Sequence, residues 1–200
     1  MSVSNGLLSY KGFGLIVWDI QYGITSRTLK LEEILENTRQ LIEASHEHKC
    51  PVVFSQGTGI PYEFQSAYSR FWLQKRGIDP KVPRMVEGSH DWEIMKEIKP
   101  TNGDLVIRKH FQSFFVGTPV EAFLRSRGVE VLVIAGVSTE VGVEATARHA
   151  AHLGFIPVIA EDAVGSSDNQ LHQASLAVMR KLFEVRTTNE IVKNINQDYA

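Results

Sequence analysis

Short apolar runs alternate along the chain with longer segments in which apolar residues recur at helical spacing. The short runs predict six strands, at residues 13–18, 51–55, 105–108, 131–135, 155–160 and 184–187. The longer segments predict five helices, at residues 29–48, 64–76, 119–127, 139–153 and 170–183. Strands separated by helices indicate a parallel sheet with helices on both faces. We therefore expect one domain over residues 1–200, an α/β fold of three layers with a six-stranded, mostly parallel, Rossmann-like sheet.

Composition and charge limit the kinds of molecule that the protein is expected to bind. The 200 residues carry 21 basic and 23 acidic side chains, a net charge of −2, which offers no basic field to a nucleic acid. The longest apolar runs, such as residues 131–137, are too short to span a bilayer, and residues 1–11 do not resemble a signal peptide. Cys50 is the only cysteine, so no internal disulfide can form. These features predict a cytoplasmic protein that binds a small molecule rather than nucleic acid or a membrane.

Polar residues follow the predicted strands at their carboxyl ends, where parallel α/β sheets bind ligands. The first strand ends in Asp19, the second in Gln56, and the third in Lys109 and His110. Each residue taken alone is also explained as an ordinary strand stop or helix cap. Asp19 could transfer a proton while Lys109 keeps it ionised or stabilises a developing anion. A purely structural ion pair is the alternative interpretation.

Residues 135–150 predict a strand that turns tightly into a helix. The first backbone N–H groups of such a helix face the edge of the sheet and can cradle an anion or oxyanion. The alternative is a plain turn in which Ser138 or Thr139 caps the helix.

Three segments, LIVWDIQYG, RKHFQSFFVGT and GVSTEVGVEATA, occur in this order along the chain. They resemble the three motifs of the isochorismatase-like hydrolase family, which includes cysteine amidohydrolases, and the resemblance extends over residues 13–165. It implies a cis peptide bond between Val137 and Ser138. It also implies a nucleophilic cysteine at position 142, where this chain has Gly142. We expect Cys50 to be a buried apolar residue at the opposite end of the sheet, so the covalent route is closed.

True isochorismatases, which this chain resembles in having Gly142 and Gln56, cleave a vinyl ether without a nucleophilic side chain. The resemblance implies that a carboxylic acid, here Asp19, protonates the vinyl carbon, and that Gly142 leaves room for a bulky substrate. It implies catalytic roles for Asp19, Lys109 and Gly142. Substrate contacts are expected from Gln56, Arg70, His110, Val137 and Ser138.

The resemblance implies no cofactor. The Asp-x-His pattern of zinc-binding relatives is absent after the second strand, so no metal is expected either. Homo-oligomers are common among relatives. A catalytically silent member that binds a small carboxylated or amide metabolite is the alternative to a hydrolase, and an engineered replacement of cysteine is a further interpretation of Gly142.

Overall fold

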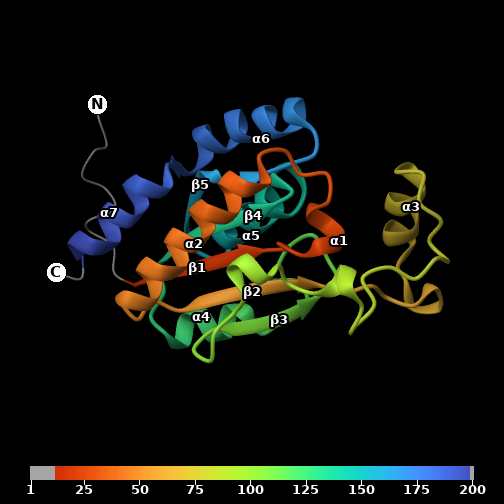
Figure 1. Ribbon diagram of the computed structural model, residues 1–200, viewed down its shortest axis with the longest axis horizontal. Coiled ribbons are helices and arrows are strands. Elements are labelled where there is room, and N and C mark those ends of the chain that lie inside the picture. Colours follow the sequence, from red (N-terminus) through yellow and green to blue (C-terminus); the bar gives the residue numbers. More distant parts are fainter. Residues whose placement is uncertain (1–11, 199–200) are drawn as a thin grey trace.

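The computed structural model describes residues 12–198 (Figure 1). Residues 1–11, in which we expect no signal peptide, lie outside this range. The strands are β1 (Phe13–Trp18), β2 (Val52–Gly57), β3 (Leu105–Lys109), β4 (Val131–Val137), β5 (Ile156–Gly165) and β6 (Glu184–Arg186). They form one sheet in the order β3-β2-β1-β4-β5-β6, and every neighbouring pair is parallel. The predicted six-stranded parallel sheet, with the first strand in its interior, is confirmed.

Helices cover both faces of the sheet, as a parallel sheet requires. The helices are α1 (Tyr22–Thr25), α2 (Leu31–Glu47), α3 (Ala67–Lys75), α4 (Val120–Ser126), α5 (Glu144–His152), α6 (Asn169–Leu182) and α7 (Thr188–Asp198). Short 3₁₀ turns lie at Tyr62–Phe64, His90–Trp92 and Lys96–Ile98, and a π turn at Thr139–Val143 precedes α5. Helices α2 and α7 share one apolar cluster, and α4, α5 and α6 share the other. Helix α3 stands apart from these layers (Figure 1).

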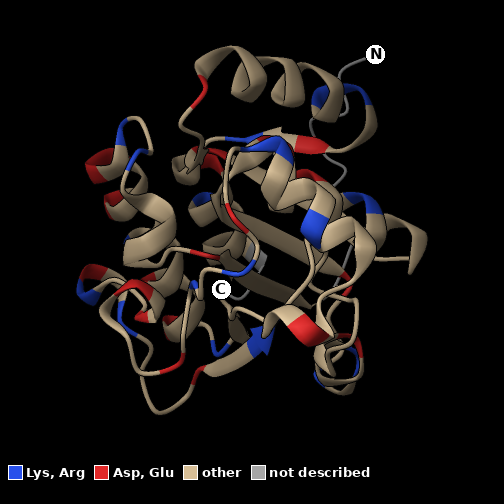
Figure 2. Ribbon diagram, turned by 90° about the vertical axis from the view of Figure 1, so that its right-hand side faces the viewer, with Lys and Arg blue, Asp and Glu red and all other residues tan. Residues whose placement is uncertain are grey.

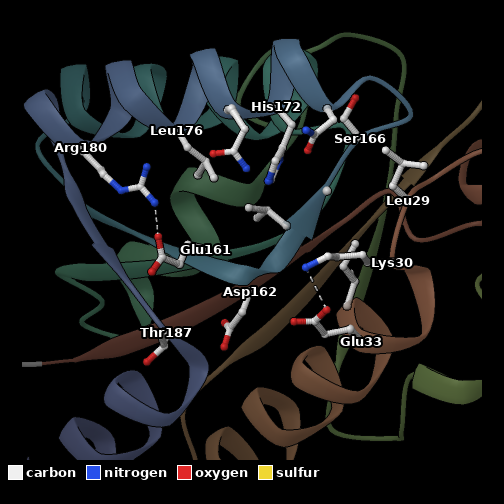
Figure 3. A pocket seen from close by; sticks show the side chains of 15 residues that line it. Leu29, Lys30, Glu33, Glu161, Asp162, Ser166, His172, Leu176, Arg180 and Thr187 are labelled. Carbon is white, nitrogen blue, oxygen red and sulfur yellow. Dashed lines mark hydrogen bonds and ion pairs between the residues drawn. The ribbon is translucent and has the colours of Figure 1, made fainter.

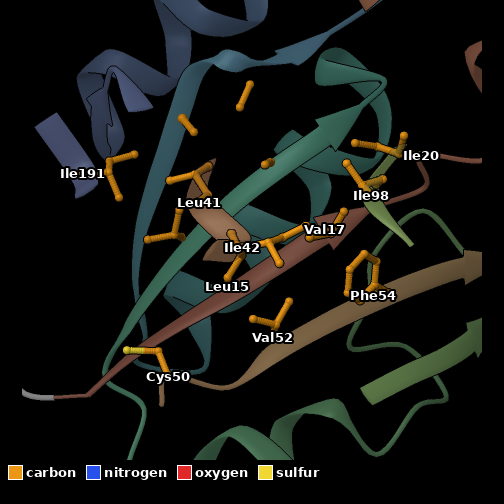
Figure 4. Packing of buried hydrophobic residues seen from close by; sticks show 14 of the residues in the cluster. Leu15, Val17, Ile20, Leu41, Ile42, Cys50, Val52, Phe54, Ile98 and Ile191 are labelled. Carbon is orange, nitrogen blue, oxygen red and sulfur yellow. The ribbon is translucent and has the colours of Figure 1, made fainter. Parts of the chain in front are cut away.

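The alternation of side chains along β1 distributes its apolar residues between the two clusters. Leu15 and Val17 pack toward α2, whereas Ile16 and Trp18 pack toward α4 and α5. Figure 4 shows the first cluster, with Cys50 near the amino ends of the strands. Cys50 is 6% exposed, which confirms that it is a buried residue remote from the carboxyl ends.

Three elements differ from the prediction. The short helix α1 was not predicted. Strand β5 continues to Gly165, beyond the predicted end at residue 160, and includes Glu161 and Asp162. Its pairing with β4 shifts near Gly136 and then resumes, so the two acidic residues lie within an irregular part of the strand. Helix α7 was not predicted, yet Ile191 and Ile195 are buried in the first cluster one helical turn apart.

Figure 2 views the molecule from the side toward which the strands of Figure 1 point. Acidic and basic residues are interspersed over this side (Figure 2). Within residues 12–198, no helix has both the length and the apolar character needed to cross a membrane.

Candidate active site

The carboxyl end of the sheet brings Asp19 and Lys109 together across an intervening strand. Asp19 follows β1 with a left-handed φ of 48°, and Lys109 is the last residue of β3. Because β2 lies between these strands, the lysine side chain must cross the end of β2. That end is Gly57, where an added Cβ would lie 3.5 Å from Asp19 Oδ2. A Cβ there would lie closer to Gln21 Oε1, at 3.2 Å, than to the carboxylate.

The Asp19 carboxylate is held at both oxygens. Lys109 Nζ donates to Oδ2, and Ser55 Oγ donates to Oδ1 at 2.6 Å. The Asp19 backbone N–H donates to the same Ser55 hydroxyl at 3.0 Å. Side-chain exposures of 7% for Asp19 and 9% for Lys109 make this a buried charge pair. The predicted meeting of Asp19 and Lys109 is therefore present in the structure.

Burial sets the proton affinity of Asp19. Loss of hydration raises the pKa of Asp19 above its usual value, and this outweighs the lowering by Lys109, Ser55 and the Gly57 backbone. The sequence led us to expect that Lys109 keeps Asp19 ionised. Lys109 does lower this pKa, but the burial of the carboxylate outweighs its effect. A raised pKa suits a group that must carry a proton.

The space beside Gly142 is filled by Trp18. A Cβ added at Gly142 would lie 2.0 Å from Trp18 Nε1 and 2.1 Å from its Cε2. Trp18 is 2% exposed, and its ring meets Phe114 edge to face with centroids 5.8 Å apart. The expectation that Gly142 leaves room for a bulky substrate is therefore wrong, because an aromatic side chain of the protein takes that room.

The turn after β4 forms the start of the expected cradle. The peptide bond between Val137 and Ser138 is cis, as the resemblance implies. The Ser138 carbonyl accepts from the N–H groups of Val141, Gly142 and Val143 at 3.3, 3.1 and 3.3 Å. The N–H of Gly142 is thus directed into the helix, and the expected cradle is only partly open to a ligand.

The remaining predicted contact residues are spread over a wider area. Gln56 is buried, and its Nε2 donates to the Trp92 carbonyl at 3.2 Å. The exposed His110 places Nδ1 2.8 Å from the Thr58 carbonyl. Arg70 lies on α3, where it donates to the Gln65 carbonyl at 2.9 Å. The structure therefore keeps Arg70 within the projecting α3 segment rather than at Asp19.

Sequence reasoning missed two residues that build the site. Ser55 was noticed only as the end of a strand, although it binds both the backbone and the carboxylate of Asp19. Gln21 is fully buried and exchanges hydrogen bonds with both backbone groups of Gly57. The signal was available for Gln21, because a polar side chain two residues after Asp19 must find partners if it is buried.

Comparison with known proteins identifies the family. The sequence matches the isochorismatase domain family over residues 13–191. The chain belongs to the isochorismatase family. The isochorismatase family protein YecD of Escherichia coli O157:H7 is 31% identical over 189 residues, covering 92% of this chain and 97% of that protein. The ureidoacrylate amidohydrolase RutB of Rhizobium rhizogenes is 33% identical over 176 residues, covering 82% of this chain and 71% of that protein.

Solved structures show the same fold. A cysteine hydrolase from Pseudomonas syringae pv. phaseolicola 1448A superimposes with a TM-score of 0.83 at 20% identity, over 100% of this chain and 97% of that one. This isochorismatase family member therefore shares the fold of family hydrolases.

A separate cavity of about 290 Å³, which neither Asp19 nor Lys109 lines, lies between β5, α2 and α6 (Figure 3). Its charged residues largely pair among themselves: Arg180 with Glu161, and Lys30 with Glu33 at 3.5 Å. His172, which lines it, contacts Thr139 Oγ1 at 2.8 Å, and so touches the π turn after the cis peptide. Among residues 12–198, no three His, Cys, Asp or Glu side chains gather closely enough to hold a metal ion.

Proposed function

We propose that this isochorismatase family member is a hydrolase that acts without a covalent intermediate, with Asp19 as general acid. The observation that carries the proposal is the buried Asp19 carboxylate, which Lys109 and Ser55 hold at the carboxyl end of the sheet. Burial raises its pKa, which makes Asp19 easier to protonate than a hydrated carboxylate. Lys109 and Ser55 fix its orientation. A thiolate route has no nucleophile, because position 142 is glycine and Cys50 lies near the other end of the strands.

The reaction class that fits is vinyl-ether hydrolysis of the isochorismate type. Asp19 gives its proton to the vinyl carbon, and the resulting oxocarbenium ion takes up water. The hydrated species loses an alcohol and becomes a ketone, while the proton released from water returns to the Asp19 carboxylate. Between these two proton transfers Asp19 is ionised, and Lys109 balances its charge. Lys109 also attracts a carboxylated substrate to this edge of the sheet.

A catalytically silent binder is the second candidate, and two observations favour it. Trp18 occupies the space beside Gly142, and the Gly142 N–H is bonded to Ser138. Both features reduce what the turn can offer to a transition state. A small carboxylated or amide metabolite could still bind at Lys109 without reaction.

Turnover assays separate the two candidates. The protein is incubated with isochorismate and with a panel of amides and carbamoyl compounds, and products are followed by chromatography. We expect Asp19→Asn to reduce turnover by about 10²–10⁴-fold, the usual share of a general acid. Asp168→Asn is the matched control, because asparagine also caps a helix and residue 168 caps α6. Wild-type turnover in Asp19→Asn refutes the acid role, and binding of these compounds without any turnover supports the silent binder.

We further propose that the enzyme is cytoplasmic and forms a homo-oligomer. A chain with one cysteine can form no internal disulfide, which suits a reducing compartment.

Helix α3 has no buried side chain, and it exposes Tyr68 and Phe71 while the preceding turn exposes Phe64. Exposed aromatic groups of this kind are typical of surfaces covered by another chain. Light scattering should give a mass above 22.4 kDa, and Phe71→Ser should lower it.

A further inference from the structure

Two bulky side chains and a glycine lie together at the π turn. Trp18 is the last residue of β1, Phe114 belongs to the loop after β3, and Gly142 lies within the turn itself. Trp18 and Phe114 are in edge-to-face contact, and both are almost fully buried. The atoms nearest to a Cβ at position 142 all belong to the Trp18 indole. The Trp18 indole thus fills the space that a side chain at position 142 would need.

The same indole also borders the charge pair. Lys109 Nζ lies 4.0 Å from the centroid of the Trp18 ring, which places the ammonium within cation–π range. On one side Trp18 therefore contacts the backbone at Gly142, and on another it contacts the lysine that binds Asp19.

We propose that Trp18 sets the substrate class of this site. Its indole excludes a nucleophilic side chain, and any acyl group bound to one, from position 142. Substrates are then restricted to those whose reaction needs only Asp19 and Lys109. The substrate half of this proposal rests on the proposed function, whereas the steric half concerns packing alone.

A double-mutant cycle tests the steric half. All variants carry Cys50→Ala, so that an introduced cysteine is the only thiol. Gly142→Cys should lower the melting temperature by roughly 5–10 °C, because its Cβ overlaps a ring in a packed core. In Trp18→Leu the same cysteine should cost much less, because the overlapping ring is gone. An equal cost in both backgrounds overturns the steric half. If Trp18→Leu does not fold, Trp18→Phe with Gly142→Ala gives the same comparison.

Thiol labelling supplies a second readout, which reports access to residue 142. Iodoacetamide should label the thiol introduced by Gly142→Cys at least about 10-fold faster in Trp18→Leu than beside the native tryptophan, because the thiol becomes accessible. Gly103→Cys is the matched control, since its Cβ meets no atom within 4 Å, and Trp18→Leu should not change its labelling rate. Equal labelling of the thiol at position 142 in the two backgrounds contradicts the proposal.

The substrate half is tested with the amide panel. In Trp18→Leu/Gly142→Cys, the thiolate would attack an amide carbonyl and expel the amine, which takes a proton, and water would then hydrolyse the thioester. We expect iodoacetamide-sensitive amide hydrolysis in this double variant and none in either single variant. A folded, rapidly labelled double variant without such hydrolysis overturns the substrate half. None of these outcomes depends on the Asp19→Asn assay, so failure of the proposed function remains distinguishable.

Discussion

Removing the positive charge at Lys109 should destabilise the fold strongly. In Lys109→Met the buried Asp19 carboxylate loses the ammonium that now contacts it. Breaking one side of a buried ion pair costs about 3–5 kcal/mol, which corresponds to a fall of roughly 6–20 °C in melting temperature for a chain of this length. Urea denaturation at pH 7 measures the change in unfolding free energy. Lys30→Met is the control, because the Lys30 side chain is 77% exposed and its ion pair should contribute at most about 1 kcal/mol.

The loss of unfolding free energy in Lys109→Met should also depend on pH, and it should grow as pH rises. Burial already raises the pKa of Asp19 in the folded protein, and loss of Lys109 removes the largest influence that lowers it. Between the unfolded value near 3.8 and the raised folded value, the folded state binds more protons than the unfolded state. Unfolding free energy of Lys109→Met should therefore fall as pH rises through this interval, and the penalty should be smallest at or below pH 3.8.

The double variant Asp19→Asn/Lys109→Met completes the test. It removes both charges, so its stability should lie near that of the parent and well above that of Lys109→Met. A Lys109→Met protein as stable as the parent, with a flat pH profile, would refute the buried charge pair.

Three further predictions concern the surroundings of the site. Gln21→Leu should cost about 2–4 kcal/mol in urea denaturation, because Gln21 bonds both backbone groups of Gly57 and the Trp92 carbonyl at 2.6 Å. Asp168→Ala should cost about 1 kcal/mol in the same assay, because the carboxylate caps α6 through two backbone N–H groups; an unchanged midpoint contradicts the cap. Iodoacetamide should leave any turnover of the native protein unchanged, and inactivation that Cys50→Ala prevents would overturn the non-covalent mechanism.

The sequence predicted those parts of the site that lie along single strands. An apolar run followed by Asp19, and another followed by Lys109, are local patterns, and parallel pairing carries both residues to one edge. The strand order that places β2 between them is not local, so the sequence did not show that Lys109 reaches Asp19 across the end of β2. Helix α7 could have been predicted, because Ile191 and Ile195 recur at helical spacing, but the segment is short and mostly polar.

The role of Trp18 shows why contacts distant in sequence resist prediction. In the sequence Trp18 is simply the last apolar residue of a strand, and Gly142 is simply a missing side chain. Their complementarity exists only once β1 and β4 are paired, because Trp18 lies beside Gly136 in that register. Gly136 has a φ of 124°, and an added Cβ there would lie 2.0 Å from the Trp18 carbonyl oxygen. Gly136 thus accommodates the backbone of residue 18, whereas Gly142 accommodates its side chain.

The position of β1 inside the sheet has a kinetic consequence. Its partner β2 follows soon in the chain, through Leu15 and Val52, but its other partner β4 comes far later, through Phe13 and Val131. Closing that long loop costs entropy before any contact compensates for it, so refolding should be slow for a chain of this size. Until β4 arrives, one edge of a wholly apolar strand stays unpaired. Recovery of native protein on dilution from urea should therefore fall steeply as protein concentration rises.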